Sequence, residues 1–270
     1  MTIRHALADG VAPLLAAGFA RLARRRAGEP VHHHGLALAG DLVLAPRVGP
    51  VGAALLDRPG RYRVRARLSW GLGGGRIPDV AGLAVRVLDA GGRGRPQDLL
   101  LDGSRPTPRD RVLVLRRDLA GWYGSPLRLR LGGPAGPKVQ VTVRLEAGVP
   151  GRLTLAGARA AAVAGRLRGV LLVHDAGRLL ATGQLCLDEV VRPGDPARPR
   201  FDVGVTGGGL VGTGFWQVLR QRAYAAARAA DPRPAPRSLG RDEHPEDDVD
   251  HDLRARQQAG QQEEQPDPGR

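Results

Sequence analysis

Residues 61–70 alternate without exception between two kinds of side chain. Apolar residues occupy the even positions of this stretch, and arginine or serine occupies the odd positions. A period of two is the pattern of a β-strand with one buried and one exposed face. Residues 139–145 repeat it, with Val or Leu opposed to Gln, Thr and Arg. The chain is therefore expected to fold around a β-sheet that is apolar on one side.

Further short apolar stretches are separated by Gly and Pro rather than by helices. Asp175-Ala176-Gly177 has the composition of a tight hairpin turn. Many short strands at close spacing favour an antiparallel barrel or a sandwich over a parallel α/β sheet. The additional strands are expected at residues 36–44, 82–88, 111–115, 127–131, 169–174, 178–187 and 201–205.

Two helices and a tail complete the expected organisation. Residues 1–27 predict an N-terminal amphipathic helix, because an apolar run at 11–22 precedes three arginines; the run is too short for a transmembrane segment. Residues 215–230 predict a second helix, ended by Asp231-Pro232. Residues 231–270 are rich in Pro, Arg, Asp, Glu and Gln and are expected to form a disordered polar tail. The expected fold class is therefore α+β.

Charge and cysteine content limit the classes of partner. The chain has a net charge of +14, while the segment from Asp231 onward has 11 acidic and 6 basic residues, so the rest carries +19. Lys138 is the only lysine, aromatics make up 3% of the chain, and the arginines are dispersed. We therefore expect no specific nucleic-acid binding; an Arg-rich module for acidic partners remains an alternative. Cys186 is the single cysteine, which excludes an intrachain disulfide and favours a cytoplasmic location.

Two motifs carry little weight alone. Residues 31–35 contain three adjacent histidines, which point in alternate directions on an extended chain and so cannot share one metal. Taken alone, the motif favours a polar surface segment before a strand. Residues 207–212 have the Gly-x-Gly-x-x-Gly spacing of a dinucleotide fingerprint. The helix that follows leads into the tail and not into a second parallel strand, so we interpret this motif as a glycine-rich loop.

A third motif lies in the expected helix at 215–230. Arg220, Tyr224 and Arg228 follow one another at four-residue spacing and form a stripe with a phenol between two guanidiniums. Nearby cations lower the pKa of a phenol, and a phenolate is a competent axial ligand for ferric haem. The alternative is a solvated Arg-rich helix with Tyr224 packed on the barrel.

These pieces occur in the order of one family. Val31-His32-x-x-Gly35-x(4)-Gly40 resembles the distal-histidine stretch of haem catalases, and Val64-x-x-Arg67-Leu68-Ser69 resembles their Val-Arg-Phe-Ser strand. Residues 79–86 and 98–100 are similar to the next two family motifs, and Arg220-x-x-x-Tyr224 is similar to the proximal helix. The resemblance covers residues 28–230 and is closest to the reduced catalase-related proteins of actinobacteria. It implies a closed antiparallel β-barrel with a proximal helix.

The resemblance also implies roles and a cofactor, haem b. His32 is the implied distal acid–base, held by Ser69, and Arg67 meets a haem propionate. Tyr224 is the implied ligand of the haem iron, supported by Arg220 and by the stripe's second cation, Arg228.

Several positions depart from the family pattern. The distal asparagine is replaced by Asp102, and the phenylalanines of two strand motifs by Leu68 and Leu83. The expected function is therefore weak peroxidase action on peroxide or a small hydroperoxide, with a homo-oligomer left open. The alternative is a barrel that has lost haem and serves as a non-enzymatic small-molecule binding or scaffold protein.

Overall fold

Every strand pairing in the main sheet is antiparallel, and the sheet closes on itself. The computed structural model describes residue 21 and residues 34–71, 78–106, 111–148, 152–192, 195 and 200–229. Within these residues, eight strands form a closed antiparallel barrel. In order around the barrel they are β1 (His34–Leu44), β2 (Gly60–Trp70), β3 (Asp79–Val87), β4 (Gln97–Asp102), β8 (Gly121–Gly124), β10 (Lys138–Glu146), β11 (Leu167–Asp175) and β12 (Arg178–Val190).

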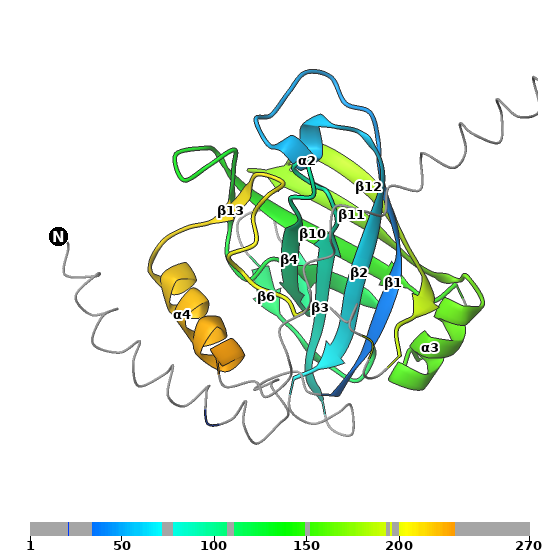
Figure 1. Ribbon diagram of the computed structural model, residues 1–270. Helices are drawn as coiled ribbons and strands as arrows, with labels where there is room; N and C mark the ends of the chain where they lie inside the picture. Colours follow the sequence, from blue (N-terminus) through cyan, green and yellow to red (C-terminus); the bar gives the residue numbers. More distant parts are fainter. Residues whose placement is uncertain are drawn as a thin grey trace, which may run out of the picture. The chain divides into compact units, whose positions relative to one another are not determined.

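Short elements extend or cover this barrel. β9 (Leu129–Leu131) pairs with β10, and β13 (Leu210–Gly212) pairs with β9. β7 (Leu115–Arg116) pairs with β3, while β5 (Ser104–Pro106) and β6 (Arg111–Leu113) form a separate hairpin. The helices are α2 (Ala54–Asp57), α3 (Leu155–Val163) and α4 (Phe215–Ala229). Figure 1 shows α3 and α4 on opposite sides of the barrel.

The interior is built from alternate residues of the barrel strands. Leu38, Ala66, Val85 and Leu99 are partners in register across β1 to β4, and all four are buried. Equivalent residues of the other strands join them in one apolar cluster. The even-numbered residues of β2 face the interior and the odd-numbered residues face the other side, as the alternation at 61–70 predicts. The expected exposure of the second face holds for Arg61 and Arg63, whereas Arg67 and Ser69 are buried.

Several sequence expectations are confirmed and others are wrong. The β11–β12 turn has positive φ at Ala176 (45°) and Gly177 (89°), as a two-residue hairpin of this kind requires. The strand expected at 201–205 is absent, since this segment has no ladder of its own. The helix α3 was not expected; Thr154 caps it by accepting a hydrogen bond from Gly157 N, and it packs on β12.

Of the two expected helices, the second is confirmed, and the N-terminal one lies almost entirely outside the described residues. α4 occupies the range predicted for the second helix. Of the predicted N-terminal helix only residue 21 is described, and it is helical. The tail from 231 lies outside the described residues. None of the described helices is both long and apolar enough to cross a membrane.

Candidate functional site

The outer face of β1 to β4 carries a row of residues with very little side-chain bulk. Strand register aligns Gly35, Ser69, Gly82, Asp102 and Gly124 across five neighbouring strands. Ser69 is buried, and its Oγ donates to the Gly82 carbonyl at 3.3 Å. Because the other three residues of this row are glycines, only Ser69 and Asp102 project side chains from it.

The next row along the same face places Arg67 among small and apolar residues. Register aligns Ala37, Arg67, Ala84 and Leu100. Arg67 is buried, and a Cβ added at Gly35 would lie 3.0 Å from its Cζ. The guanidinium therefore occupies space that only glycine leaves free. Arg67, Ser69 and Asp102 thus share a flat face whose floor is Gly and Ala.

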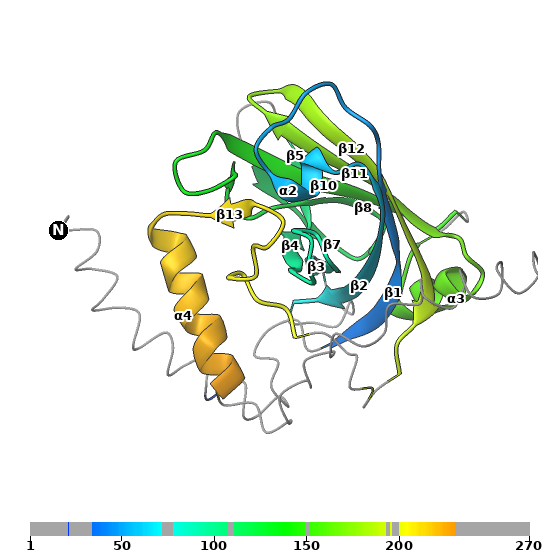
Figure 2. The same ribbon diagram turned by 45° about the horizontal axis from the view of Figure 1, so that its top comes forward.

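The helix α4 lies outside the barrel beside β13, as Figure 2 shows. Gln217, Arg220 and Tyr224 follow at three- and four-residue spacing and so share one face of the helix. Gln217 is buried, and its Nε2 donates to the Val203 carbonyl at 2.9 Å. Both Gln217 and Arg220 line a pocket against β4. The face of α4 that carries Tyr224 is therefore turned towards the barrel.

The electrostatic environment of Tyr224 differs from the sequence expectation. Burial raises the pKa of the phenol above its usual 10.0, although the positive charge of Arg220 and a hydrogen bond with it act in the opposite direction. The prediction that neighbouring arginines leave this phenol with a lowered pKa is therefore wrong for the protein alone. Arg220 does contact Tyr224 as predicted, and its effect is smaller than the cost of burying a phenolate.

A network that the sequence did not predict fixes the segment between β12 and β13. Arg86 Nε and Nη2 donate to the two oxygens of Asp98, each at 2.7 Å. Asp98 Oδ2 also accepts from Asp202 N at 2.7 Å, and Arg86 Nη2 donates to the Arg200 carbonyl at 2.7 Å. The Asp98 side chain is fully buried. This charge pair anchors residues 200–202, which lead into β13 and α4, on the outer face of β3 and β4.

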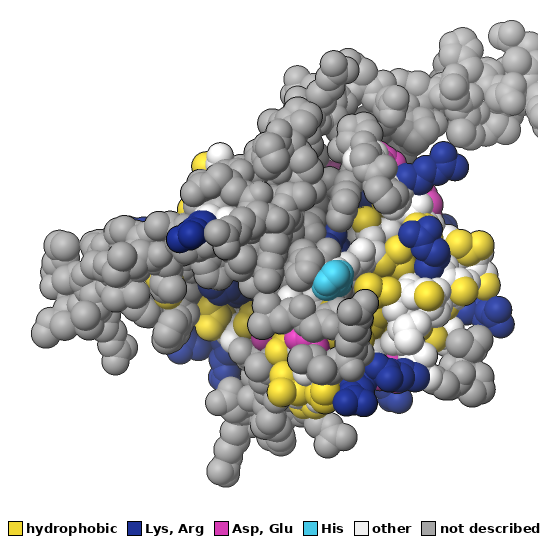
Figure 3. Space-filling model, turned by 90° about the horizontal axis from the view of Figure 1, so that it is seen from below, with side chains coloured by type: hydrophobic (Ala, Val, Ile, Leu, Met, Phe, Trp, Pro, Cys, Tyr) yellow, Lys and Arg dark blue, Asp and Glu magenta, His cyan; other side chains and the backbone are white. Residues whose placement is uncertain are grey.

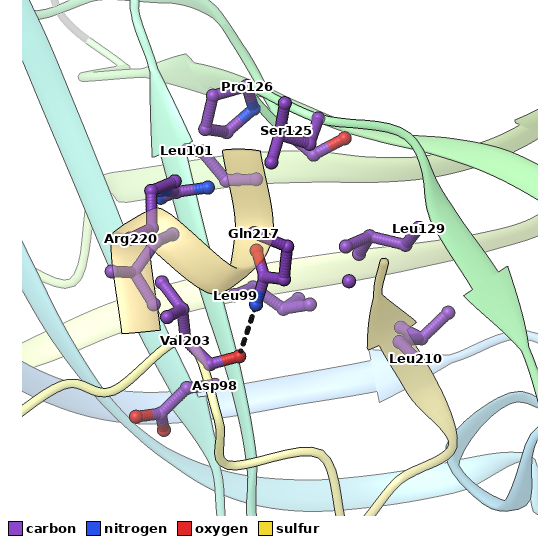
Figure 4. Close-up of a pocket in the computed structure, with 13 residues that line it drawn as sticks. Asp98, Leu99, Leu101, Ser125, Pro126, Leu129, Val203, Leu210, Gln217 and Arg220 are labelled. Atoms are coloured by element: carbon purple, nitrogen blue, oxygen red, sulfur yellow. Dashed lines mark hydrogen bonds between the residues drawn. The ribbon is translucent and has the colours of Figure 1, made fainter. Parts of the chain in front are cut away.

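The pocket lies where β4 and β8 separate. Those two strands pair at one position only, Asp102 with Gly124. Beyond it the gap is bordered by β9, β13 and α4 and leaves a small cavity of about 30 Å³. Figure 4 shows Arg220 and Gln217 on one side of the pocket and Leu129 and Leu210 on the other. Its lining residues are Asp98, Leu99, Leu100, Leu101, Ser125, Pro126, Leu127, Leu129, Val203, Leu210, Gly212, Gln217 and Arg220.

The predicted site residues are placed as follows. Arg67 and Ser69 share one face, and Arg220 and Tyr224 share one face of α4. His32 and the side chain of Arg228 lie outside the described residues. No group of three metal-ligating side chains occurs within the part of the chain that the structure describes. Figure 3 shows basic side chains dispersed between apolar ones on the face it presents.

Comparison with solved structures identifies the fold. Catalase A from Saccharomyces cerevisiae matches with a TM-score of 0.52 and 15% identity over 76% of this chain and 61% of that one. A fungal catalase matches with a TM-score of 0.53 and 15% identity over 77% of this chain and 60% of that one. No family model matches the chain, and no curated protein matches it. The chain has the catalase-like fold and spans about three fifths of the length of these catalases.

The described residues of this face suit a flat, mostly apolar cofactor with acidic edges, such as haem. The glycines and alanines leave a floor without bulk, and Arg67 offers a cation at its margin. A phenol supported by Arg220 is available on the helix, and Asp102 supplies an acceptor on the barrel. The donor set therefore fits haem. Burial favours the neutral phenol, and a metal ion bound to its oxygen would displace the proton.

Proposed function

We propose that this chain binds haem b against the outer face of β1 to β4 and acts as a weak peroxidase on peroxide or a small organic hydroperoxide. The observation that carries the proposal is the alignment of Arg67, Ser69 and Asp102 on one Gly- and Ala-floored face. The helix α4, which carries Tyr224 in contact with Arg220, faces the same side of the barrel.

Each residue has a defined task in this proposal. When bound, haem would supply a redox-active iron; the Tyr224 phenol would hold that iron, and Arg220 would stabilise the charged phenolate. Arg67 binds a propionate, because a guanidinium pairs with a carboxylate through two parallel hydrogen bonds. His32 carries a proton to and from the peroxide, and Ser69 orients the imidazole. Arg228 adds a second positive charge beside the phenolate.

Asp102 is the reason for proposing weak turnover. An ionised carboxylate accepts hydrogen bonds and cannot donate one, whereas an amide at this position donates from its nitrogen. A peroxide oxygen that develops negative charge is therefore not stabilised by Asp102. We propose organic hydroperoxide reduction and not efficient disproportionation of hydrogen peroxide.

The proposed cellular location follows from the cysteine content. Cys186 is a free cysteine, which is compatible with a reducing compartment, and we propose the cytoplasm. The catalases with the same fold make a homo-oligomer a reasonable expectation, and peroxide is the proposed small-molecule partner.

The experiment that tests the activity is reduction of a hydroperoxide to the alcohol and water by the haem-loaded chain, with an added one-electron donor as the reductant. His32→Ala is expected to keep the visible haem spectrum and lower turnover about a hundredfold, as loss of a general acid–base does. His174→Ala, on β11 of the barrel, is the matched control and should retain full turnover. Equal activity of the two variants would remove His32 from the mechanism.

A second function is favoured by one specific observation. Because burial raises the pKa of Tyr224, forming the phenolate that would bind ferric iron costs more than it does for an exposed tyrosine. A catalase-like barrel that has lost haem and binds another small molecule is consistent with this. Haem titration of the purified chain separates the two: a saturable Soret band favours the peroxidase, and its absence favours the binding protein.

A further inference from the structure

The large apolar side chains that are exposed gather towards one end of the barrel. Among the described residues, four of the six come from the end of β1, the loop after it, β11 and β12: Val43 (47% exposed), Val48 (99%), Val170 (44%) and Leu179 (50%). Single exposed apolar residues are ordinary, whereas a group of them marks a binding surface. Gly35, at the other end of β1, belongs to the proposed haem face, so the two surfaces are separate.

Strand register places Val43 and Val170 in one row on the outside of the barrel. Gln184 of β12 lies between them and pairs with both. In the next row, Thr182 pairs with the half-buried Leu172. The side chains of directly paired residues project on the same side of a sheet. These five uncharged residues therefore form one surface, which we call the apolar face.

The loop at 45–53, between β1 and α2, holds Val48 beside the start of β12. Arg47 Nε donates to the Leu180 carbonyl of β12 at 3.2 Å, and Arg47 Nη1 pairs with Asp57 of α2 at 3.4 Å. Asp57 also accepts from two backbone nitrogens of the loop, at 2.6 and 2.8 Å. Figure 2 shows the loop extending past the end of β1. Because the loop is fastened to both neighbours, the fold itself keeps Val48 in solvent.

Cations line the same end of the barrel, because β2, β10 and β12 all begin there. Arg61, Lys138 and Arg178 lie at or next to these three strand starts, and each is exposed. The carboxylate of Asp41 is paired with Arg61 at 2.5 Å and is buried, and Asp175 ends β11. The chain before residue 231 carries a net charge of +19. This end of the barrel therefore combines exposed apolar side chains with a basic rim.

We propose that this end of the barrel docks on an anionic lipid bilayer. Val48 and Leu179 enter the boundary between head groups and acyl chains, and the apolar face lies alongside. Arg61, Lys138 and Arg178 contact the lipid phosphates. Apolar side chains at this depth and cations close to anionic lipids each strengthen binding to a membrane surface.

The charge of the chain favours a bilayer over a second copy of the chain. In a two-fold dimer the same surface of each copy meets the other, so two basic rims would face each other. Each copy also carries +19 before residue 231, which adds to the repulsion. Anionic lipids offer the opposite charge. The proposal does not depend on haem, because none of the residues assigned to the haem site belongs to this surface.

Co-sedimentation of the purified 270-residue chain with lipid vesicles tests the proposal. We expect binding to vesicles of phosphatidylglycerol and phosphatidylcholine in equal parts, and at least about tenfold weaker binding to phosphatidylcholine alone. Added salt should weaken binding to the mixed vesicles. Val48→Ser should lower the affinity about fivefold because an apolar contact is lost, and Arg178→Gln about fivefold because one cation is lost.

The helix α3, at the opposite end of the barrel, supplies matched controls (Figure 1). Val163 and Arg159 are exposed there, so Val163→Ser and Arg159→Gln should bind vesicles as the unmodified chain does. Thermal melting checks that all four variants are folded. The proposal is overturned if the mixed vesicles are not bound, or if phosphatidylcholine alone is bound equally well. It is also overturned if Val48→Ser and Arg178→Gln bind no more weakly than their controls.

Discussion

Ser69 on β2 and Asp102 on β4 stand in one row across the outer face of the barrel, separated only by Gly82 of β3. Adjacent strands lie about 4.8 Å apart, so about 9–10 Å separates the two residues across β3. A hydroxyl and a carboxylate are thereby held on either side of Gly82. The central proposal about this protein is that haem binds against this face of the barrel.

A side chain introduced at Gly82 tests whether haem binds against this face. Gly82→Val places a branched side chain between Ser69 and Asp102, and a β-branched residue is compatible with a strand. We expect haem affinity to fall at least about tenfold while the circular dichroism spectrum is retained. Titration followed at the Soret band measures the effect. Haem binding by Gly82→Val at the original affinity would show that this face is not the cofactor site.

Ionisation of Tyr224 has a defined pH dependence. Because its pKa is raised above 10.0, the phenol stays neutral below pH 10, and its contribution to stability is complete there and is lost as the pH rises through the raised pKa. Arg220→Gln removes the opposing cation and should raise the pKa further. Difference absorbance against Tyr224→Phe, which lacks this phenol, measures the shift. A lower pKa in Arg220→Gln would contradict the described contact.

Asp41 predicts an acid-side loss of stability. A hydrogen bond from Arg61 and the charges of Arg61 and Arg63 hold the pKa of Asp41 below 3.8. Its stabilisation is present above about pH 4 and is lost as the pH falls through the lowered pKa. Asp41→Asn should flatten this part of the stability profile in urea unfolding. Both arginines are exposed, so added salt should reduce the effect; an unchanged acid limb would contradict the prediction.

The hydrogen bonds of the buried Gln97 side chain are predicted to stabilise the fold. Its side chain bonds backbone groups of Asp98, Val205 and Leu210, and it is almost fully buried. Gln97→Leu removes these hydrogen bonds from a buried position and should lower the free energy of unfolding by about 3 kcal/mol. Denaturant unfolding checks this, with Gln184→Leu, at an exposed position of β12, as control. Equal stability of both variants would show that other contacts hold Leu210 and Val205 against β4.

The strands that followed from sequence are those whose side chains alternate between apolar and polar. In β2 and β10 the apolar residues face the interior, and the polar residues are exposed or half-buried except for Arg67, Ser69 and Thr142, which are buried. β4 has apolar residues on both faces, because Leu99 and Leu101 enter the interior while Leu100 lines the pocket outside. It therefore has no period of two, and its sequence did not identify it as a strand.

The segment at 201–205 shows the opposite error. Phe201, Val203 and Val205 alternate with polar or small residues, as in a strand. The segment is held mainly by side chains: Asp98 accepts from Asp202 N, and Gln217 and Gln97 donate to the Val203 and Val205 carbonyls. One backbone bond, from Asp98 N to the Val205 carbonyl, joins it to β4. Side-chain anchoring of this kind depends on tertiary contacts that no local period records.

Only part of the candidate site could be predicted from the sequence. Alternation alone places Arg67 and Ser69 on one face. The position of Asp102 beside Ser69 required the register of β2, β3 and β4, which is set by pairing along the whole sheet. The raised pKa of Tyr224 required the burial of α4.

Haem titration of the unmodified chain and Tyr224→Phe, followed by absorbance, tests the central claim most directly. We expect the unmodified chain to give a saturable Soret band with the spectrum of a phenolate-ligated ferric haem. Tyr224→Phe, folded by circular dichroism, should lose binding or show a shifted band. Identical spectra and affinities, or no band with either chain, would contradict a haem site built on this phenol.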